Sequence, residues 1–208
     1  MAAFLSIGRT AKLTAGSFTS HLGSTCVLPM SAAQQLHKAI KAHEQGNLIA
    51  AAGLYEEVLR TEPNNATAMS NLAVIAISKR DYVTAEHYLR RALAIKEDAG
   101  TCSNLGVVLK ARGRLREAIA AYRRAIELKP EFVDPYQNLG NALREDGQAD
   151  AAANAYRRLI QFRPNSADAH NSLGNALRDA GHLQEAIAAY KEAIRLKPHN
   201  AAPIAVSF

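Results

Sequence analysis

Asparagine residues recur at a nearly constant spacing in this chain, and their amide side chains offer its clearest chemistry. Asn71, Asn104 and Asn138 stand 33 and 34 residues apart. An asparagine side chain has a carbonyl acceptor and an NH₂ group with two donors, so it can pair with the C=O and N–H groups of a peptide backbone. A row of such amides predicts binding of an extended segment, largely independent of that segment's sequence.

Other polar residues follow the same spacing, although the row has gaps at His37 and Ser172. Arginines stand one helical turn further along, and they would favour a ligand with acidic residues. An equally open alternative is that each amide bonds only to backbone nearby in its own helix. The predicted peptide-binding residues are Asn71, Asn104, Asn138, Asn141, Asn171, Asn175, Arg144 and Arg178.

The remaining reactive side chains show no spacing typical of catalysis or metal binding. The seven histidines are scattered without an H-E-x-x-H motif. Cys26 and Cys102 are far apart, and Cys102 stands at an apolar position typical of a small buried residue. The sequence has no G-x-S-x-G elbow and no glycine-rich phosphate loop. We therefore predict no catalytic residue, no metal and no cofactor, and a protein that is not an enzyme.

The asparagine spacing belongs to an internal repeat, which predicts the fold. A pattern of Leu, Gly, Ala, Tyr and Pro at 139, 140, 152, 156 and 164 recurs 34 residues later at 173, 174, 186, 190 and 198. A fixed period of this length identifies a repeat array, and this pattern is that of the tetratricopeptide repeat, with two helices per unit. We predict an all-α, right-handed superhelix (an α-solenoid) of five helix-turn-helix repeats, at residues 32–65, 66–98, 99–132, 133–166 and 167–200.

Each recurring position has a predicted role, which repeat four illustrates. Gly140 is expected where the two helices approach most closely, with Ala152 facing it. Tyr156 is expected to fill the gap to the neighbouring unit. Gly147 gives the turn its permissive backbone, and Pro164 ends the second helix because it lacks an N–H group.

Two units depart from the pattern. Repeat one has Lys38 in place of Leu, as terminal repeats often do. Repeat two is one residue short and has Glu97 in place of Pro, so a tight turn is expected after its second helix at 84–95. In repeat four, which follows the pattern, Asp134 is predicted to cap the first helix, with Pro135 at the first helical position.

Residues 201–208 begin a sixth unit, because Pro203 stands two periods after Pro135. An array normally ends in a polar capping helix, so the last full helix, with Tyr190 and Ile194, is expected to keep a bare face. Two explanations are open: the chain is the front of a longer protein, or it self-associates through this face.

Residues 1–31 lie outside the repeats and carry Arg9 and Lys12 but no acid. They weakly resemble an organellar transit peptide. The alternatives are a wrongly assigned start before Met30 and a disordered tail, of which we favour the tail. The sequence has no apolar run of the roughly 18 residues that span a membrane, so we predict no membrane partner and a cytoplasmic protein, with organellar targeting as the alternative.

The net charge is +6, and its densest part is formed by Lys110, Arg112, Arg114 and Arg116. Such a cluster could meet nucleic acid or an acidic partner. A solvated helix end is the favoured interpretation, because cations stabilise the C-terminus of a helix and no aromatic residue is interleaved for base stacking. Nucleic acid is therefore not an expected partner.

The repeats resemble those of O-linked N-acetylglucosamine transferases and their bacterial relatives. The phrases Asn138-Leu-Gly-Asn-Ala-Leu, Glu185-Ala-Ile-Ala-Ala-Tyr and Ala125-Ile-Glu-Leu-Lys-Pro carry this resemblance over residues 32–200. It implies that Asn71, Asn104 and Asn138 are rungs of an asparagine ladder that holds a protein backbone. It implies no activity, because the catalytic domain has no counterpart here. Tetratricopeptide repeat proteins that bind chaperones hold a C-terminal carboxylate with lysine and arginine residues. The matching positions of this chain lack these cations.

We therefore predict a non-catalytic protein-interaction scaffold that binds an extended peptide in the groove lined by its first helices. The alternative is the substrate-recognition arm of a glycosyltransferase resembling O-linked N-acetylglucosamine transferase, without its catalytic domain. A basic nucleic-acid adaptor ranks third.

Overall fold

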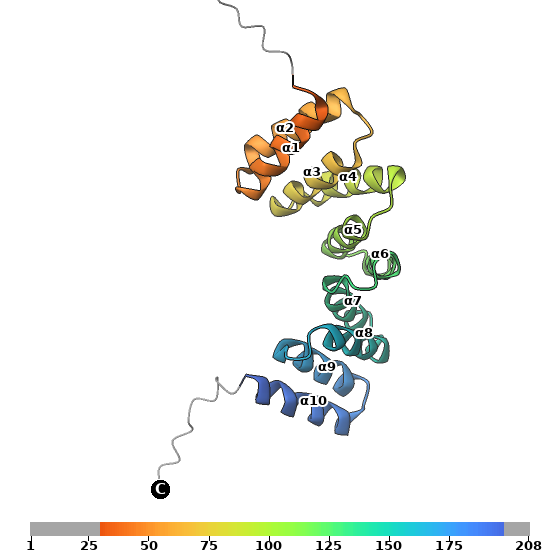
Figure 1. Ribbon diagram of the computed structural model, residues 1–208. Coiled ribbons are helices and arrows are strands. Elements are labelled where there is room, and N and C mark those ends of the chain that lie inside the picture. Colours follow the sequence, from red (N-terminus) through yellow and green to blue (C-terminus); the bar gives the residue numbers. More distant parts are fainter. Residues whose placement is uncertain (1–29, 198–208) are drawn as a thin grey trace, which may run out of the picture. The chain divides into compact units, whose positions relative to one another are not determined.

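The computed structural model of the chain describes residues 30–197. The expectations for residues 1–29 and for the sixth unit at 201–208 lie outside this range. Contacts divide the chain after Met30, and all that follows concerns the part that begins at Ser31. Its elements are α1 (Ala32–Glu44), α2 (Leu48–Thr61), α3 (Ala66–Ser78), α4 (Tyr82–Ile95), α5 (Ala99–Ala111), α6 (Leu115–Leu128), α7 (Asp134–Glu145), α8 (Ala149–Phe162), α9 (Ala167–Asp179) and α10 (Leu183–Leu196) (Figure 1).

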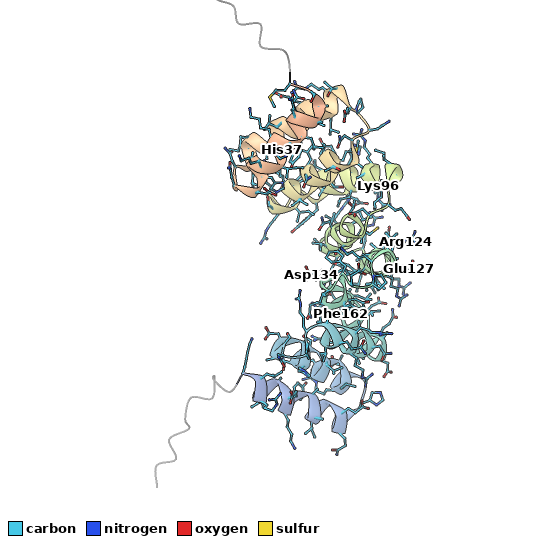
Figure 2. The ribbon with its side chains drawn as sticks, viewed as in Figure 1. His37, Lys96, Arg124, Glu127, Asp134 and Phe162 are labelled. Atoms are coloured by element: carbon cyan, nitrogen blue, oxygen red, sulfur yellow. The ribbon has the colours of Figure 1, made fainter. Side chains whose placement is uncertain are left out.

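These helices form five hairpins that stack in chain order. The two helices of each hairpin, such as α5 and α6, pack against each other, and each second helix also packs on the first helix of the next hairpin. The first helices α3, α5, α7 and α9 touch one another in series. Figure 2 shows Asp134 of the first helix α7 and the Arg124–Glu127 pair of the second helix α6 on opposite sides of the stack. The predicted all-α solenoid of helix-turn-helix repeats is confirmed.

Short polar side chains begin many of these helices. Asn47, Asn65, Asp81, Asp98 and Ser166 each accept a hydrogen bond from the backbone N–H three residues later. Such a bond satisfies one of the N–H groups that the first turn of a helix leaves without a partner. Capping residues in the sequence thus mark where many of the helices begin.

The predicted cap at Asp134 is wrong. The cap position of α7 is Val133, without a side-chain hydrogen bond, and Asp134 is the first helical residue, followed by Pro135. Its carboxylate instead accepts a hydrogen bond from the Arg163 guanidinium, at 2.9 Å. An acid in the first turn still suits the positive end of the helix dipole.

Left-handed backbone closes the turn inside every hairpin. Gly46, Gly113, Gly147 and Gly181 have φ between +75° and +83°, as predicted from their conformational freedom. Repeat two places Arg80 at the same register, and it adopts φ +59°. This conformation is costly for a residue with a Cβ atom, so the turn of repeat two is the strained one.

In repeats three, four and five, the close contact inside the hairpin joins a glycine to a tyrosine. A Cβ atom added to Gly140 would lie 2.6 Å from the ring of Tyr156, and the same is true of Gly106 with Tyr122 at 2.5 Å. Ala152 and Tyr156 are both fully buried. That Ala152 faces Gly140 and that Tyr156 also fills the gap to the next unit stay predictions. The tyrosine ring needs the hollow that the missing Cβ leaves in its own repeat.

The short connection predicted after repeat two is confirmed. Only residues 96–98 join α4 to α5, whereas residues 62–65 join α2 to α3. The second helix of repeat two begins at Tyr82, two residues before the predicted start. Lys96, directly after α4, lies beside α3.

Candidate peptide-binding groove

The three principal amides lie on consecutive first helices, Asn71 on α3, Asn104 on α5 and Asn138 on α7. All three side chains are partly buried. Asn71 donates from Nδ2 to the Thr67 carbonyl oxygen, 3.0 Å away, so one of its donors bonds within its own helix. The amides of Asn104 and Asn138 have no hydrogen-bond partner among residues 30–197.

Asn141 and Asn175 differ from these three because a tyrosine holds each of them. The hydroxyl of Tyr156 donates to Oδ1 of Asn141 at 2.7 Å, and that of Tyr190 donates to Oδ1 of Asn175 at 2.9 Å. Each bond joins the second helix to the first helix of one hairpin. The carbonyl end of both amides is therefore engaged, and the NH₂ end remains for another acceptor. The fifteen-residue spacing of each pair is the sequence signal for this link.

The two predicted cationic anchors share a single carboxylate. Arg144 Nε lies 3.4 Å from one oxygen of Asp179, and Arg178 donates to the other at 2.9 Å. The hydrogen bond that Arg178 donates to Asp179 raises the pKa of Arg178, and negative charge near the guanidinium acts in the same sense. Asp179 is not among the predicted site residues, and it neutralises part of the charge expected to attract acidic ligands.

Asn171 is exposed, and it lines a cavity of about 550 Å³ next to Tyr190 and Ile194 of α10. No hydrogen bond fixes its amide among residues 30–197. The helix α10 also carries three exposed large apolar side chains, those of Leu183, Ile187 and Ile194. Ile187 is 47% exposed, whereas Ile119 and Ala153, at the same register of repeats three and four, are 4% and 1% exposed. The predicted uncovered face of the last helix is thus present.

The cationic cluster at the end of α5 is largely paired. Arg112 and Arg114 both donate to Glu86 of α4, and Lys110 lies 2.8 Å from Glu145 of α7. Burial would raise the pKa of Glu86, but hydrogen bonds from Arg90 and Arg114, with the charge of Arg112, outweigh burial and lower it. The cluster therefore links neighbouring repeats, which favours the structural interpretation over nucleic-acid binding.

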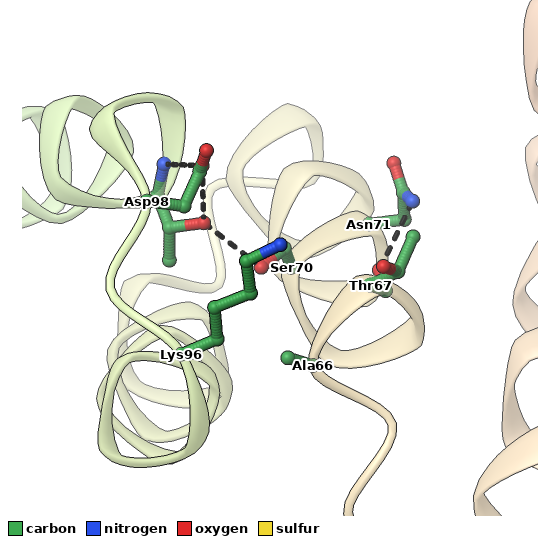
Figure 3. A pocket seen from close by; sticks show the side chains of 7 residues that line it. Ala66, Thr67, Ser70, Asn71, Lys96 and Asp98 are labelled. Atoms are coloured by element: carbon green, nitrogen blue, oxygen red, sulfur yellow. Dashed lines mark hydrogen bonds between the residues drawn. The ribbon is translucent and has the colours of Figure 1, made fainter. Parts of the chain in front are cut away.

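A polar pocket of about 220 Å³ lies at the start of α3 and α5 and contains Asn71 (Figure 3). We call it the Lys96 pocket. Of the residues that line this pocket, only Asn71 was predicted from the sequence to bind a ligand. Its lining residues are Ala66, Thr67, Ser70, Asn71, Lys96, Asp98 and Thr101.

A second cavity, of about 380 Å³, is mainly apolar and lies among α6, α7 and α8. Tyr136, Leu139 and Leu143 of α7 form part of its wall. None of the predicted binding residues lines it. It lies on the side of α7 that packs against second helices, and so it is separate from the amide row.

The part of the chain that the structure describes holds no group of three His, Cys, Asp or Glu side chains arranged for a metal ion. No helix within residues 30–197 has both the length and the apolar composition needed to cross a membrane. Cys102 is buried and unpaired, as predicted. Burial raises the pKa of its thiol, which makes it a poor nucleophile.

Ten helices in five stacked hairpins, with a recurring Gly–Tyr contact, define a helical repeat protein among the described residues. Three tetratricopeptide repeat models match the sequence, at residues 42–101, 106–146 and 138–201. The chain belongs to the tetratricopeptide repeat family.

Solved structures with the same fold include the MamA protein and YrrB. One MamA structure has a TM-score of 0.73 with 24% identity, over 85% of this chain and 97% of MamA. A second has a TM-score of 0.71 with 26% identity, over 77% and 94%. YrrB, described as a TPR protein with an unusual peptide-binding site, has a TM-score of 0.74 with 22% identity, over 82% and 88%.

A curated relative with detectable sequence similarity is the RNA polymerase-associated protein CTR9 of Caenorhabditis elegans. The two are 34% identical over 80 residues, which are 36% of this chain and 7% of CTR9. The chain thus matches a small part of that relative's length.

Proposed function

We propose that this protein is a non-catalytic scaffold that holds an extended peptide segment along the first helices of its repeats. The observation that carries the proposal is that the side-chain amides of Asn104 and Asn138 are available for hydrogen bonding. Both amides are partly buried, lie on the touching helices α5 and α7, and have no partner within residues 30–197. Such amides can exchange water for a ligand backbone without breaking any bond within the protein.

The spacing of the amides suits a strand-like ligand. Packed helices lie about 8–10 Å apart. An extended chain advances about 3.3 Å per residue, so rungs on neighbouring first helices meet every third residue of a peptide. Asn141 adds the free NH₂ group that Tyr156 leaves available. Recognition then depends mainly on backbone groups, which every peptide sequence supplies.

Retention of a random peptide pool tests this function. Decapeptides of neutral residues, acetylated and amidated at their ends, are passed over the immobilised full chain. We expect retention by the wild type, roughly tenfold weaker retention after Asn104→Ala with Asn138→Ala, and no change after Asn154→Ala on the second helix α8. No retention by the wild type, or equal losses in the two variants, would contradict the proposal.

Self-association through α10 is a second candidate, because its face is apolar and open. Residues at the register of Ile187 are covered by the next hairpin in repeats three and four, and a second copy of this chain would cover it in the same way. Light scattering over a range of concentrations should show a dimer that Ile187→Glu abolishes. Ile49→Glu, at an exposed isoleucine of α2, should leave the dimer intact. A monomer at every concentration would refute this candidate.

The same groove would serve as the substrate-recognition arm of a glycosyltransferase, which remains the alternative proposal. It differs from a free-standing scaffold only in being joined to a catalytic domain. Genomic sequence around the coding region distinguishes them. A glycosyltransferase domain in continuous frame would favour the arm.

A further inference from the structure

The last cation of a repeat pairs with the first acid of the same repeat in repeats four and five. Arg163 donates to Asp134 at 2.9 Å, and Lys197 donates to Asp168 at 2.8 Å. The two pairs are one period apart in the sequence. Each joins the end of the second helix to the start of the first helix, beside the inner side of the stack.

Repeats two and three have a cation at the equivalent position at the end of the second helix but no acid at the equivalent position of the first helix. Lys96 and Lys129 stand at the register of Arg163, but Thr67 and Gly100 stand where Asp134 belongs. Neither lysine forms an ion pair with a carboxylate among residues 30–197. These repeats therefore present a lysine whose internal partner has been replaced by a neutral residue.

Lys96 differs from Lys129 because it reaches over a pocket. Figure 3 shows its side chain extending from the end of α4 across the Lys96 pocket towards Ser70. The pocket volume, about 220 Å³, is several times the roughly 30 Å³ that a water molecule occupies in the liquid. Lys129 does not line this pocket.

The acids that flank Lys96 in the sequence are already engaged. Glu97 pairs with Arg124 of α6. Asp98 accepts hydrogen bonds from the Thr101 N–H and hydroxyl, at 2.8 and 2.9 Å, and so caps α5. Its negative charge faces the positive end of that helix dipole. The Thr101 hydroxyl in turn lies 3.0 Å from that of Ser70, which fixes the rear wall of the pocket.

The open side of the pocket offers donors. The Lys96 ammonium has three, the Asn71 amide keeps one N–H after its bond to Thr67, and the Thr67 hydroxyl adds another. Charged donors beside neutral ones suit an ionised carboxylate, since hydrogen bonds to charged groups are roughly twice as strong as neutral ones. Asn71 also belongs to the amide row, so the pocket opens beside the proposed peptide path.

We propose that the Lys96 pocket binds the carboxylate of an aspartate or glutamate side chain in the peptide held by the scaffold. The ligand's acid takes the place that Asp134 and Asp168 occupy in their own repeats. This inference rests on the proposed function and deepens it, because it adds side-chain selectivity at repeat two to recognition of the backbone.

Two decapeptide pools test the pocket. Both are acetylated and amidated at their ends, with Glu at the central position in one and Gln in the other, and neutral residues elsewhere. Their affinities for the full chain are measured by fluorescence anisotropy at low salt. We expect the wild type to bind the Glu pool about five- to tenfold more tightly than the Gln pool.

Three variants identify the residue responsible. Lys96→Met removes the ammonium and keeps a chain of similar length, and Thr67→Asp restores the internal pair seen at Asp134. Both should remove the preference for Glu while leaving affinity for the Gln pool unchanged. Lys129→Met, the matched control, should keep the preference. Thermal unfolding should show that Thr67→Asp folds, since an acid in the first turn of α3 suits the helix dipole.

The outcomes separate this inference from the proposed function. Binding of both pools with equal affinity, or a Glu preference that survives Lys96→Met, overturns the pocket and leaves the scaffold standing. Loss of the preference in Lys129→Met as well indicates nonspecific charge attraction and also overturns it. Failure of the wild type to bind either pool overturns both. A Gln pool with a free C-terminal carboxylate that binds as well as the Glu pool overturns the assignment to a side chain.

Discussion

The hydroxyl of Tyr156 donates a hydrogen bond to Oδ1 of Asn141, 2.7 Å away across the two helices of repeat four. The same ring lies against Gly140, where a Cβ atom would approach it to 2.6 Å. One residue therefore fills the hairpin core and orients an amide of the first helix α7. Packing and the candidate groove are coupled through this tyrosine.

Tyr156→Phe should lower the free energy of unfolding by about 1 kcal/mol, because the Asn141 carbonyl loses its shorter hydrogen bond and keeps only the one from Gln137, at 3.2 Å. Tyr122→Phe is the matched control. Tyr122 is equally buried, but Val107 stands at the register of Asn141, and the Tyr122 hydroxyl has no partner among residues 30–197. Urea unfolding of both variants checks the difference. Equal losses would show that the hydroxyl bond contributes nothing.

Gly140→Ala should destabilise the protein by about 1–3 kcal/mol, since the added methyl group would force the buried Tyr156 ring to move. Gly53 in α2 provides the comparison, because nothing lies within 4 Å of a Cβ atom placed there. Gly53→Ala should stabilise by about 0.5–1 kcal/mol through helix propensity. Thermal and urea unfolding measure both. Two stabilising substitutions would refute the close Gly–Tyr contact.

Arg80→Gly should raise the stability by up to about 1 kcal/mol. Left-handed backbone costs a residue with a Cβ atom about 1–2 kcal/mol, and the greater freedom of glycine in the unfolded chain returns part of this gain. Gly147→Ala, at φ +78° in the equivalent turn, should have the opposite sign. Chemical denaturation measures the free energy of unfolding of both variants. A loss of stability in Arg80→Gly would mean that the arginine side chain contributes more than the strain.

Glu86→Gln should lower the stability at neutral pH by about 2 kcal/mol, because a buried carboxylate that accepts charged hydrogen bonds is lost. The pKa of Glu86 is lowered in the folded state, so its contribution is present above the ordinary value of 4.5 and is lost as the pH falls through the folded value. The stability gap between wild type and variant should therefore close on acidification.

A pH series of urea unfolding curves measures this gap. Glu97→Gln, at an exposed ion pair with Arg124, serves as the control and should cost less than Glu86→Gln. A gap for Glu86 that stays constant down to pH 3 would contradict the role assigned to its charge.

The hairpins and their order follow from local sequence signals. Gly147 marks a turn because only left-handed backbone closes it, and Asn65 and Ser166 mark helix starts because their oxygens cap free N–H groups. These effects act within a few residues, and so a single sequence suffices to predict them.

Contacts between helices were predicted less well. The packing of the Tyr156 ring on Gly140 depends on the direction of side chains in paired helices. The sharing of Asp179 by Arg144 and Arg178 depends on the distance between neighbouring repeats. Neither is fixed by residue spacing alone. Comparison of Thr67 with Asp134 across the repeats would have pointed to Lys96.

The side-chain NH₂ signals of Asn104 and Asn138 in two-dimensional ¹⁵N–¹H NMR test the central claim most directly. A peptide retained from the neutral pool is titrated into the labelled full chain. We predict that both signals shift with the same midpoint while the signal of Asn154 on α8 stays in place. Binding that shifts the Asn154 signal, or neither of the first two, would contradict a ligand held by the amides of the first helices.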